Sequence, residues 1–250
     1  MDISNFKSPL KFKPVQIGKA RLFEQEPGYY VLTYNDQRFM GYNTNLHWHP
    51  EEFIIESNLA FGKCITTGLG LGLIQSILMA NEKVTEVVVY EKNQDVIEVF
   101  LFLAQNSNLD ISKLNIVCQD ANTIKNEKAN CIFIDHYETN DFVLILNTVK
   151  NIADNNNCDI LWYWPAALQY MLYCAKTKQS IDENSFYKFS NYINVKSFPN
   201  KLDNRSFEQI INLEKTYKKV GNKFLFDNVE IANIKRNEIL SRKKFNKEII

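Results

Sequence analysis

Three glycines and a glutamate mark the part of this 250-residue chain whose residue types and spacing best suggest chemistry. Gly68, Gly70 and Gly72 alternate with other residues directly after an apolar run, and Glu91 ends the next apolar run. This order predicts a strand, a tight turn, a helix and a second strand that ends on an acid. Backbone N–H groups at such a turn are free to face an anionic or polar ligand. We therefore expect a ligand site at the glycine turn.

The spacing of the glycines narrows the choice of ligand. A dinucleotide-binding turn needs G-x-G-x-x-G, whereas this chain has G-x-G-x-G and places Leu73 where the third glycine would stand. The chain also lacks G-x-x-x-x-G-K-[ST], the loop that grips nucleotide phosphates. The pattern therefore disfavours NAD and FAD and excludes a P-loop.

The glycine turn and the acid resemble a known family. Residues 67–72 (TGLGLG) and 87–91 (VVVYE) resemble the first two motifs of class I S-adenosylmethionine-dependent methyltransferases, closest to the spermidine synthase-like branch. The resemblance implies S-adenosylmethionine as cofactor, with Glu91 accepting hydrogen bonds from its ribose hydroxyls. It also implies that Thr67, Gly68, Gly70 and Gly72 form the turn whose backbone approaches the methionine part of the cofactor. A solvated acid capping a helix is the alternative for Glu91.

The resemblance continues at residues 117–121 (VCQDA), which match the segment where an acid meets the adenine amino group. It implies that Asp120 and Ala121 border the adenine. Cys118 and Gln119 stand where a glycine often precedes the acid, which is a departure from the family pattern. A turn-forming or helix-capping aspartate is an equally open reading of Asp120.

The candidates for catalysis lie at residues 135–138 (DHYE), after the fourth apolar run. The catalytic acid of spermidine synthases lies in this neighbourhood, so the resemblance places Asp135 there. Asp135 would orient a substrate amine and His136 would take a proton, with an exposed loop histidine as the alternative. The segment departs from the Asp/Asn-Pro-Pro-Tyr signature of enzymes that methylate amino groups of nucleic acids, which counts against a base-methylating enzyme.

The elements that position these residues alternate along the chain. Apolar runs predict strands at 63–67, 86–91, 114–118, 131–135 and 159–163, and helices are expected at 71–80, 95–105, 140–153 and 165–176. Strands that are apolar on both faces and alternate with helices indicate a parallel sheet covered on both sides. We therefore predict a doubly wound, mostly parallel, Rossmann-like α/β fold with ligands beyond the carboxyl ends of the strands.

Two domains are predicted. Residues 1–60 form a small β-rich extension with a hairpin of strands 29–34 and 37–42 and a helix at 50–60. Residues 61–250 form the α/β domain, whose helical, basic C-terminal part includes helices at 206–219 and 229–245 and a strand at 223–226.

Composition limits the other readings. No apolar run is long enough to cross a bilayer and the first residues lack the apolar core of a secretory signal, so we expect a cytoplasmic protein without a membrane partner. The five cysteines show no paired spacing, which indicates no disulfide framework. His47 and His49 would need Glu51 or Glu52 to form a metal site, and we predict no metal and a pocket wall or turn instead.

The last 75 residues are basic, with 16 Lys and Arg against 9 Asp and Glu. Residues 242–247 (RKKFNK) could contact nucleic acid weakly, although a solvated helix end is the favoured reading. The leading function is an S-adenosylmethionine-dependent methyltransferase whose acceptor, a small molecule or a nucleic acid, is undetermined. Aminopropyl transfer from decarboxylated S-adenosylmethionine and a non-catalytic binding protein are the alternatives, and an oligomer is compatible with each.

Overall fold

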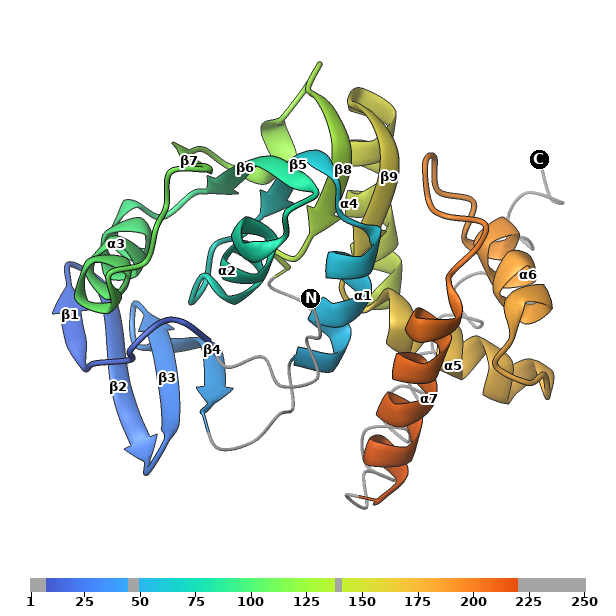
Figure 1. Cartoon of the computed structure of the whole chain (residues 1–250), viewed down its shortest axis with the longest axis horizontal. Helices are drawn as coiled ribbons and strands as arrows, with labels where there is room; N and C mark the ends of the chain where they lie inside the picture. Colours follow the sequence, from blue (N-terminus) through green and yellow to red (C-terminus); the bar gives the residue numbers. More distant parts are fainter. Residues whose placement is uncertain (1–7, 45–49, 138–140, 220–250) are drawn as a thin grey trace, which may run out of the picture.

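The computed structural model describes residues 8–44, 50–137 and 141–219 of the chain. The described residues form a four-stranded antiparallel sheet and a five-stranded parallel sheet with helices packed around it (Figure 1). His47, His49 and the basic segment 242–247 lie outside the described residues. The predictions that concern them therefore stay predictions.

The N-terminal sheet is an antiparallel meander in which each strand pairs with the next along the chain. Its strands are β1 (Val15–Ile17), β2 (Ala20–Glu26), β3 (Tyr29–Tyr34) and β4 (Gln37–Asn43). Asn35 and Asp36 join β3 to β4 with φ angles of 50° and 60°, as a two-residue type I′ turn requires. The predicted hairpin is confirmed, and β1 and β2 are two strands that the sequence pattern did not reveal.

The parallel sheet has the strand order β7-β6-β5-β8-β9. Its strands are β5 (Gly62–Thr67), β6 (Val84–Glu91), β7 (Leu114–Cys118), β8 (Lys128–Ile134) and β9 (Asn157–Tyr163). Every neighbouring pair runs parallel, and the order reverses between β5 and β8. In open α/β sheets ligands bind beyond the carboxyl ends of the strands at such a reversal. The predicted α/β fold class is confirmed.

Helices cover both faces of this sheet. They include α2 (Leu73–Ala80), α3 (Gln94–Ser107), α4 (Phe142–Asn155) and α5 (Ala166–Thr177). The chain passes from β5 through β6 to β7 in one direction along the sheet, and from β8 to β9 in the opposite direction. Right-handed crossovers therefore place α2 and α3 on one face of the sheet and α4 on the other. Figure 1 agrees, with α2 in front of the strands and α4 behind β8 and β9. Helix α2 starts two residues later than predicted, because Gly72 holds the N-cap position in the left-handed conformation.

Three further helices complete the described chain: α1 (Pro50–Leu59), α6 (Glu183–Ile193) and α7 (Asn204–Lys219). Helix α1, which we expected within the N-terminal extension, packs against α2 and α7. Helix α6 was not predicted. The strand and helix expected at 223–226 and 229–245 lie outside the described residues. The division of the chain at residue 60 stays a prediction.

Helix α6 is held by an aromatic cluster and a capping box. The fully buried Phe186 ring lies 6.4 Å from Trp162 of β9 and 5.9 Å from Phe198, measured between ring centroids. The Asp182 carboxylate accepts the backbone N–H of Ser185 at 2.9 Å, and the Ser185 hydroxyl accepts the backbone N–H of Asp182 at 3.1 Å. Both halves of the box stabilise the start of α6.

We expect Asp182→Ala to lower the free energy of unfolding by about 1 kcal/mol, because an N-cap side chain of this kind contributes roughly that much. Chemical denaturation measures the change. Asp182→Ser keeps a capping oxygen and should recover most of the loss. Asp154→Ala, at an exposed position near the end of α4, is the matched control. Equal stability of Asp182→Ala and the control would contradict the capping role.

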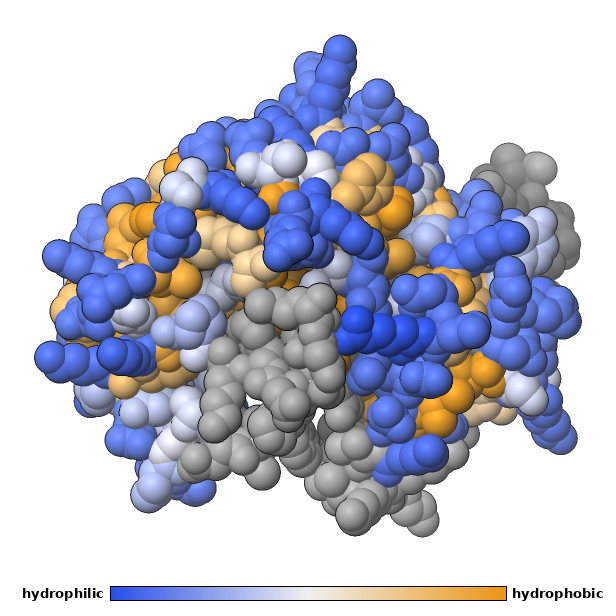
Figure 2. All heavy atoms as spheres, in the orientation of Figure 1, coloured by the Kyte–Doolittle hydropathy of each residue, from blue (hydrophilic) through white to orange (hydrophobic). Residues whose placement is uncertain are grey.

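Within the described part of the chain, no helix combines the length and the apolar character needed to span a bilayer. The face shown in Figure 2 is mostly hydrophilic, with hydrophobic side chains exposed between hydrophilic ones.

Candidate active site

The glycine turn links β5 to α2 at the reversal of the strand order. Gly68, Gly70 and Gly72 have φ angles of 79°, 51° and 72°, in the left-handed region that favours glycine. A Cβ on Gly68 would overlap the carbonyl oxygen of Asp135, and one on Gly72 would overlap the ring of Phe100 in α3. Gly68 therefore allows close approach of the turn to the end of β8, whereas Gly72 makes room for packing between helices.

The Glu91 side chain is buried and fastens the turn. Its Oε2 atom accepts the backbone N–H of Leu69 at 3.1 Å, and its Oε1 atom accepts the backbone and side-chain N–H groups of Asn93 at 2.9 and 3.0 Å. A carboxylate oxygen has two lone pairs, so Oε2 keeps one for a further donor. The predicted ribose acid is thus in place beside the turn. At 3% exposed Glu91 is not a solvated acid, but its bond to the N–H of Asn93, the N-cap residue of α3, is the helix-end contact that the alternative expected. Ribose binding by Glu91 stays a prediction.

The N-terminal sheet also reaches the glycine turn. The Met40 thioether of β4 accepts the backbone N–H of Leu71 at 3.4 Å, and a Cβ on Gly70 would lie 2.7 Å from the same sulfur. No motif in the sequence pointed to Met40. Because a methionine side chain is flexible, it can yield to a ligand on the turn or pack against it.

A hydrogen-bonded chain joins the glycine turn to the segment after β7. The Nδ1 atom of His136 lies 2.7 Å from the Thr67 hydroxyl, and its Nε2 atom lies 3.2 Å from Oδ1 of Asn122. The Asn122 amide donates in turn to Asp120 Oδ1 at 3.0 Å. A neutral imidazole protonated on Nε2 satisfies every bond, with the Thr67 hydroxyl donating to Nδ1.

These contacts bear on two of the predicted site residues. Asp120 caps the 3₁₀ helix Ala121–Thr123 by accepting the Asn122 N–H at 2.9 Å, so the capping alternative is what the structure displays. The Asp120 side chain remains exposed and Ala121 is buried, and adenine contact by either residue stays a prediction. Proton transfer by His136 also stays a prediction, because one of its two hydrogen bonds would first have to break.

Asp135 follows β8 directly and lies beside the turn. Its backbone N–H donates to the Thr67 hydroxyl at 3.1 Å, and its carbonyl oxygen faces Gly68. The side chain contacts solvent, yet the surrounding protein removes enough water from the carboxyl group to raise its pKa to about 6. A carboxylate with this pKa is largely ionised at neutral pH and still basic enough to take a proton from an acceptor.

Tyr137 adds a polar group that the sequence prediction left without a role. Burial and the nearby carboxyl groups of Asp135 and Glu56 raise the pKa of its hydroxyl well above the ordinary value. The hydroxyl is buried and makes no hydrogen bond within the described structure. It therefore remains protonated and is available to a ligand at this edge of the sheet.

Five sequence-predicted residues are thus brought together at the carboxyl edge of the parallel sheet, and three neighbours were missed. The predicted residues that meet here are Thr67, Gly68, Glu91, Asp135 and His136. Glu56 and Met40 come from segments without a recognisable motif, and Asn122 directly follows the predicted adenine segment 117–121; the tertiary fold alone brings them to the site. The residues present fit an adenosylated cofactor, since positive-φ glycines, a buried carboxylate with a spare lone pair and an exposed Asp120 line one edge.

Comparisons with known proteins give fold-level likeness. No protein-family model and no curated protein matches this chain. The spermidine synthase from Thermotoga maritima shares 17% identity over 58% of this chain and 54% of its own, with a TM-score of 0.44. A spermidine synthase in complex with the transition state analogue AdoDATO shares 17% identity over 58% of this chain and 53% of its own, with a TM-score of 0.43.

An S-adenosylmethionine-dependent methyltransferase from Clostridium acetobutylicum shares 19% identity over 44% of this chain and 45% of its own, with a TM-score of 0.33. The chain therefore matches about half the length of these solved structures. The solved structures that it resembles include spermidine synthases and an S-adenosylmethionine-dependent methyltransferase.

Proposed function

We propose that this protein is an S-adenosylmethionine-dependent methyltransferase whose acceptor lies next to Asp135. One observation carries the proposal: Thr67 and Gly68, which begin the glycine turn, contact the backbone of Asp135 directly. A carboxyl group with a raised pKa therefore lies at the same sheet edge as the turn that the resemblance assigns to the cofactor. Proximity of this kind is the main contribution an enzyme makes to methyl transfer.

When bound, S-adenosylmethionine supplies a methyl group to a lone pair of the acceptor, and the electrons of the broken sulfur–methyl bond return to sulfur. Asp135 would take the proton that the acceptor loses, either directly or through water. Tyr137 would donate its buried hydroxyl to an acceptor atom and so orient it. Glu91 and the turn residues would bind the cofactor but take no part in proton transfer.

Cofactor binding is tested by thermal shift. S-adenosylmethionine at a hundred times its dissociation constant should stabilise the fold by about 2.7 kcal/mol. We expect Glu91→Gln to weaken binding roughly tenfold to hundredfold, because a hydrogen bond to a charged group contributes about 1.5–3 kcal/mol. Glu82→Gln, at an exposed position before β6, is the matched control. No stabilisation of the wild type, or equal binding by both variants, would contradict the proposed site.

Aminopropyl transfer is the second candidate. It is favoured by the carboxyl groups of Asp135 and Glu56, which lie close enough to Tyr137 to influence its hydroxyl. Two carboxylates at one sheet edge would attract a cationic amine acceptor. A larger thermal shift with decarboxylated S-adenosylmethionine than with S-adenosylmethionine would select this function. Stabilisation by both compounds without any transfer would select the third candidate, a binding protein.

A further inference from the structure

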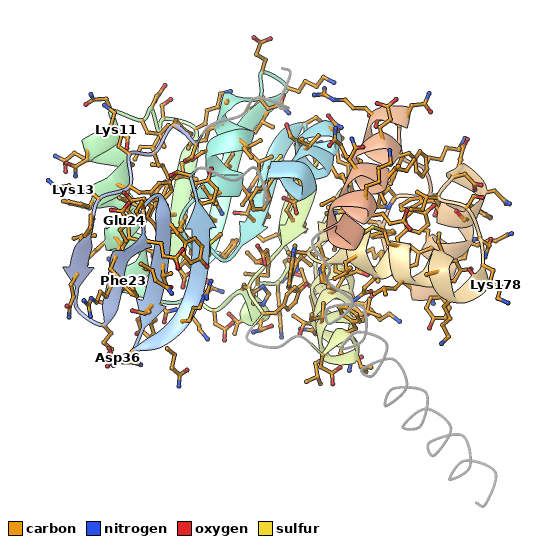
Figure 3. All side chains as sticks on the ribbon, turned by 90° about the horizontal axis from the view of Figure 1, so that it is seen from below. Lys11, Lys13, Phe23, Glu24, Asp36 and Lys178 are labelled. Atoms are coloured by element: carbon orange, nitrogen blue, oxygen red, sulfur yellow. The ribbon has the colours of Figure 1, made fainter. Side chains whose placement is uncertain are left out.

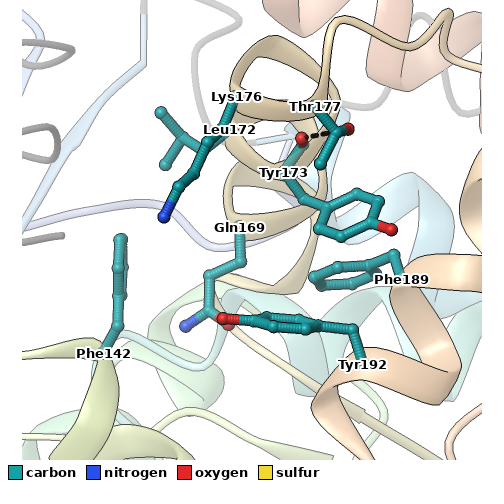
Figure 4. A pocket seen from close by; sticks show the side chains of 8 residues that line it. All are labelled: Phe142, Gln169, Leu172, Tyr173, Lys176, Thr177, Phe189 and Tyr192. Atoms are coloured by element: carbon teal, nitrogen blue, oxygen red, sulfur yellow. Dashed lines mark hydrogen bonds between the residues drawn. The ribbon is translucent and has the colours of Figure 1, made fainter. Parts of the chain in front are cut away.

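A cavity of about 130 Å³ lies beyond the helix starts that follow β8 and β9. Phe142, the first residue of α4, and Gln169, in the first turn of α5, line it from the sheet side. Tyr173, Phe189 and other residues of α5 and α6 complete its walls (Figure 4). Both helix starts follow carboxyl ends of parallel strands, so one side of the cavity faces the edge of the sheet where ligands of this fold bind, and the other walls come from the second half of α5 and from α6.

Gln169 gives the cavity an unsatisfied hydrogen-bond donor. The residue is 7% exposed, and its Oε1 atom accepts the Tyr163 hydroxyl at 2.8 Å. The other end of the amide, Nε2, is buried and has no hydrogen-bond partner within the described structure. In Figure 4 the amide lies between Phe142 and Tyr192. A buried donor without a partner costs stability unless a ligand supplies an acceptor.

The remaining walls select a flat, anionic ligand. Four aromatic side chains line the cavity: Phe142, Tyr173, Phe189 and Tyr192. A cavity of roughly 150 Å³ is known to hold one benzene ring, so the size suits a single six-membered ring. Lys176 borders the cavity, and among the described residues no carboxylate pairs with its ammonium group. The charge at the rim is thus positive, which opposes a polyamine in this part of the site.

The cavity is connected to Asp135 through tyrosines. Tyr163 ends β9 and is the strand partner of Ile134, the residue before Asp135. The Tyr163 hydroxyl donates to Gln169, and the hydroxyls of Tyr163 and Tyr137 are close enough to interact electrostatically. A ligand on Gln169 would therefore lie on the side of Asp135 away from the glycine turn.

We propose that this cavity binds the acceptor of the transferase, and that the acceptor is a small single-ring aromatic molecule carrying an anionic group and a hydroxyl or amino group. Its ring packs between the aromatic walls, its anionic group pairs with Lys176, and one of its oxygen or nitrogen atoms accepts from Gln169. The role as acceptor, but not the binding itself, rests on the proposed function.

The test uses three probes on the full chain: 4-hydroxybenzoate, benzylamine and cyclohexanecarboxylate. They separate the charge of the ligand from its ring. NMR titration should show 4-hydroxybenzoate shifting the side-chain amide signals of Gln169 and binding more tightly than both other probes. Lys176→Gln should weaken its binding about fivefold, the size expected of one partly exposed ion pair. Lys178→Gln is the matched control, since Lys178 is exposed and points away from the molecule in Figure 3.

The outcomes separate this inference from the proposed function. Equal binding of benzylamine and 4-hydroxybenzoate, an equal effect of the two lysine variants, or unshifted Gln169 signals would overturn the cavity assignment even if S-adenosylmethionine binds. Probe binding at Gln169 without any binding of S-adenosylmethionine would overturn the acceptor role and the proposed function, but leave the ligand class standing. Tighter probe binding in the presence of S-adenosylhomocysteine would support both.

Discussion

Asp135→Asn is expected to reduce the rate of transfer by about 100- to 10,000-fold while cofactor binding stays unchanged, because general-base catalysis contributes an effect of that size. Asparagine has nearly the same shape as aspartate and leaves the backbone N–H bond to Thr67 intact. The measurement is the initial rate with a saturating acceptor, together with the thermal shift caused by the cofactor. Asp154→Asn, exposed on α4, is the control.

The same residue should set the acid limb of the pH profile. Because desolvation by the surrounding protein raises the Asp135 pKa to about 6, the wild-type rate should rise with pH through about 6, and this limb should vanish in Asp135→Asn. The folded protein then binds the proton more tightly than the unfolded chain. Ionisation of Asp135 therefore lowers stability as pH rises from about 4 to above 6.

As pH rises through this interval, the melting temperature of the wild type should therefore fall relative to that of Asp135→Asn. A variant with wild-type rate would exclude Asp135 as the base. A lower rate with an unchanged pH profile would show that Asp135 positions the acceptor but does not act as the base.

Gly68→Ala is expected to abolish the stabilisation by S-adenosylmethionine and to lower the free energy of unfolding by about 1–3 kcal/mol, the range for a strained backbone position. The added Cβ would meet the backbone carbonyl of Asp135, which directly follows β8 and is held by the bond from its own N–H to Thr67. Any relief of this overlap separates the turn from the acid, so both binding and transfer suffer.

Gly70→Ala provides the comparison. Gly70 has a positive φ as well, but the atom its Cβ would meet is the sulfur of Met40, at the flexible end of a side chain. We expect Gly70→Ala to retain more stability and more cofactor binding than Gly68→Ala, as measured by denaturation and thermal shift in parallel. A larger loss at Gly70 would show that conformational strain, and not contact with β8, dominates at this turn.

The cofactor half of the candidate site depends on local sequence to a large extent. A glycine that must adopt positive φ is visible in the sequence, and so is an acid that ends an apolar strand, because strand and turn are set by residues close in the chain. The parallel α/β fold followed from the alternation of apolar runs and helical patterns for the same reason. The hairpin at Asn35 and Asp36 was equally local.

The acceptor half depends on contacts between distant segments. Glu56, Tyr137 and Gln169 come from α1, from the segment after β8 and from α5, and no spacing in the chain relates them. Helix α6 was missed although its buried residues Phe186, Phe189 and Ile193 follow helical spacing, so a signal for it was present in the sequence. The aromatic cluster around Phe186, which joins this helix to β9, depends on the tertiary fold.

The sequence by itself therefore determined the sheet, the glycine turn and the positions of Glu91 and Asp135 along the chain, since each depends on backbone preferences over a few residues. Only the tertiary structure decided what surrounds them. It buried Glu91, joined His136 to Asn122, raised the pKa of Asp135 and left the Gln169 donor without a partner in an aromatic cavity. Burial and unsatisfied hydrogen bonds are properties of packing between distant segments, and a linear pattern carries no record of them.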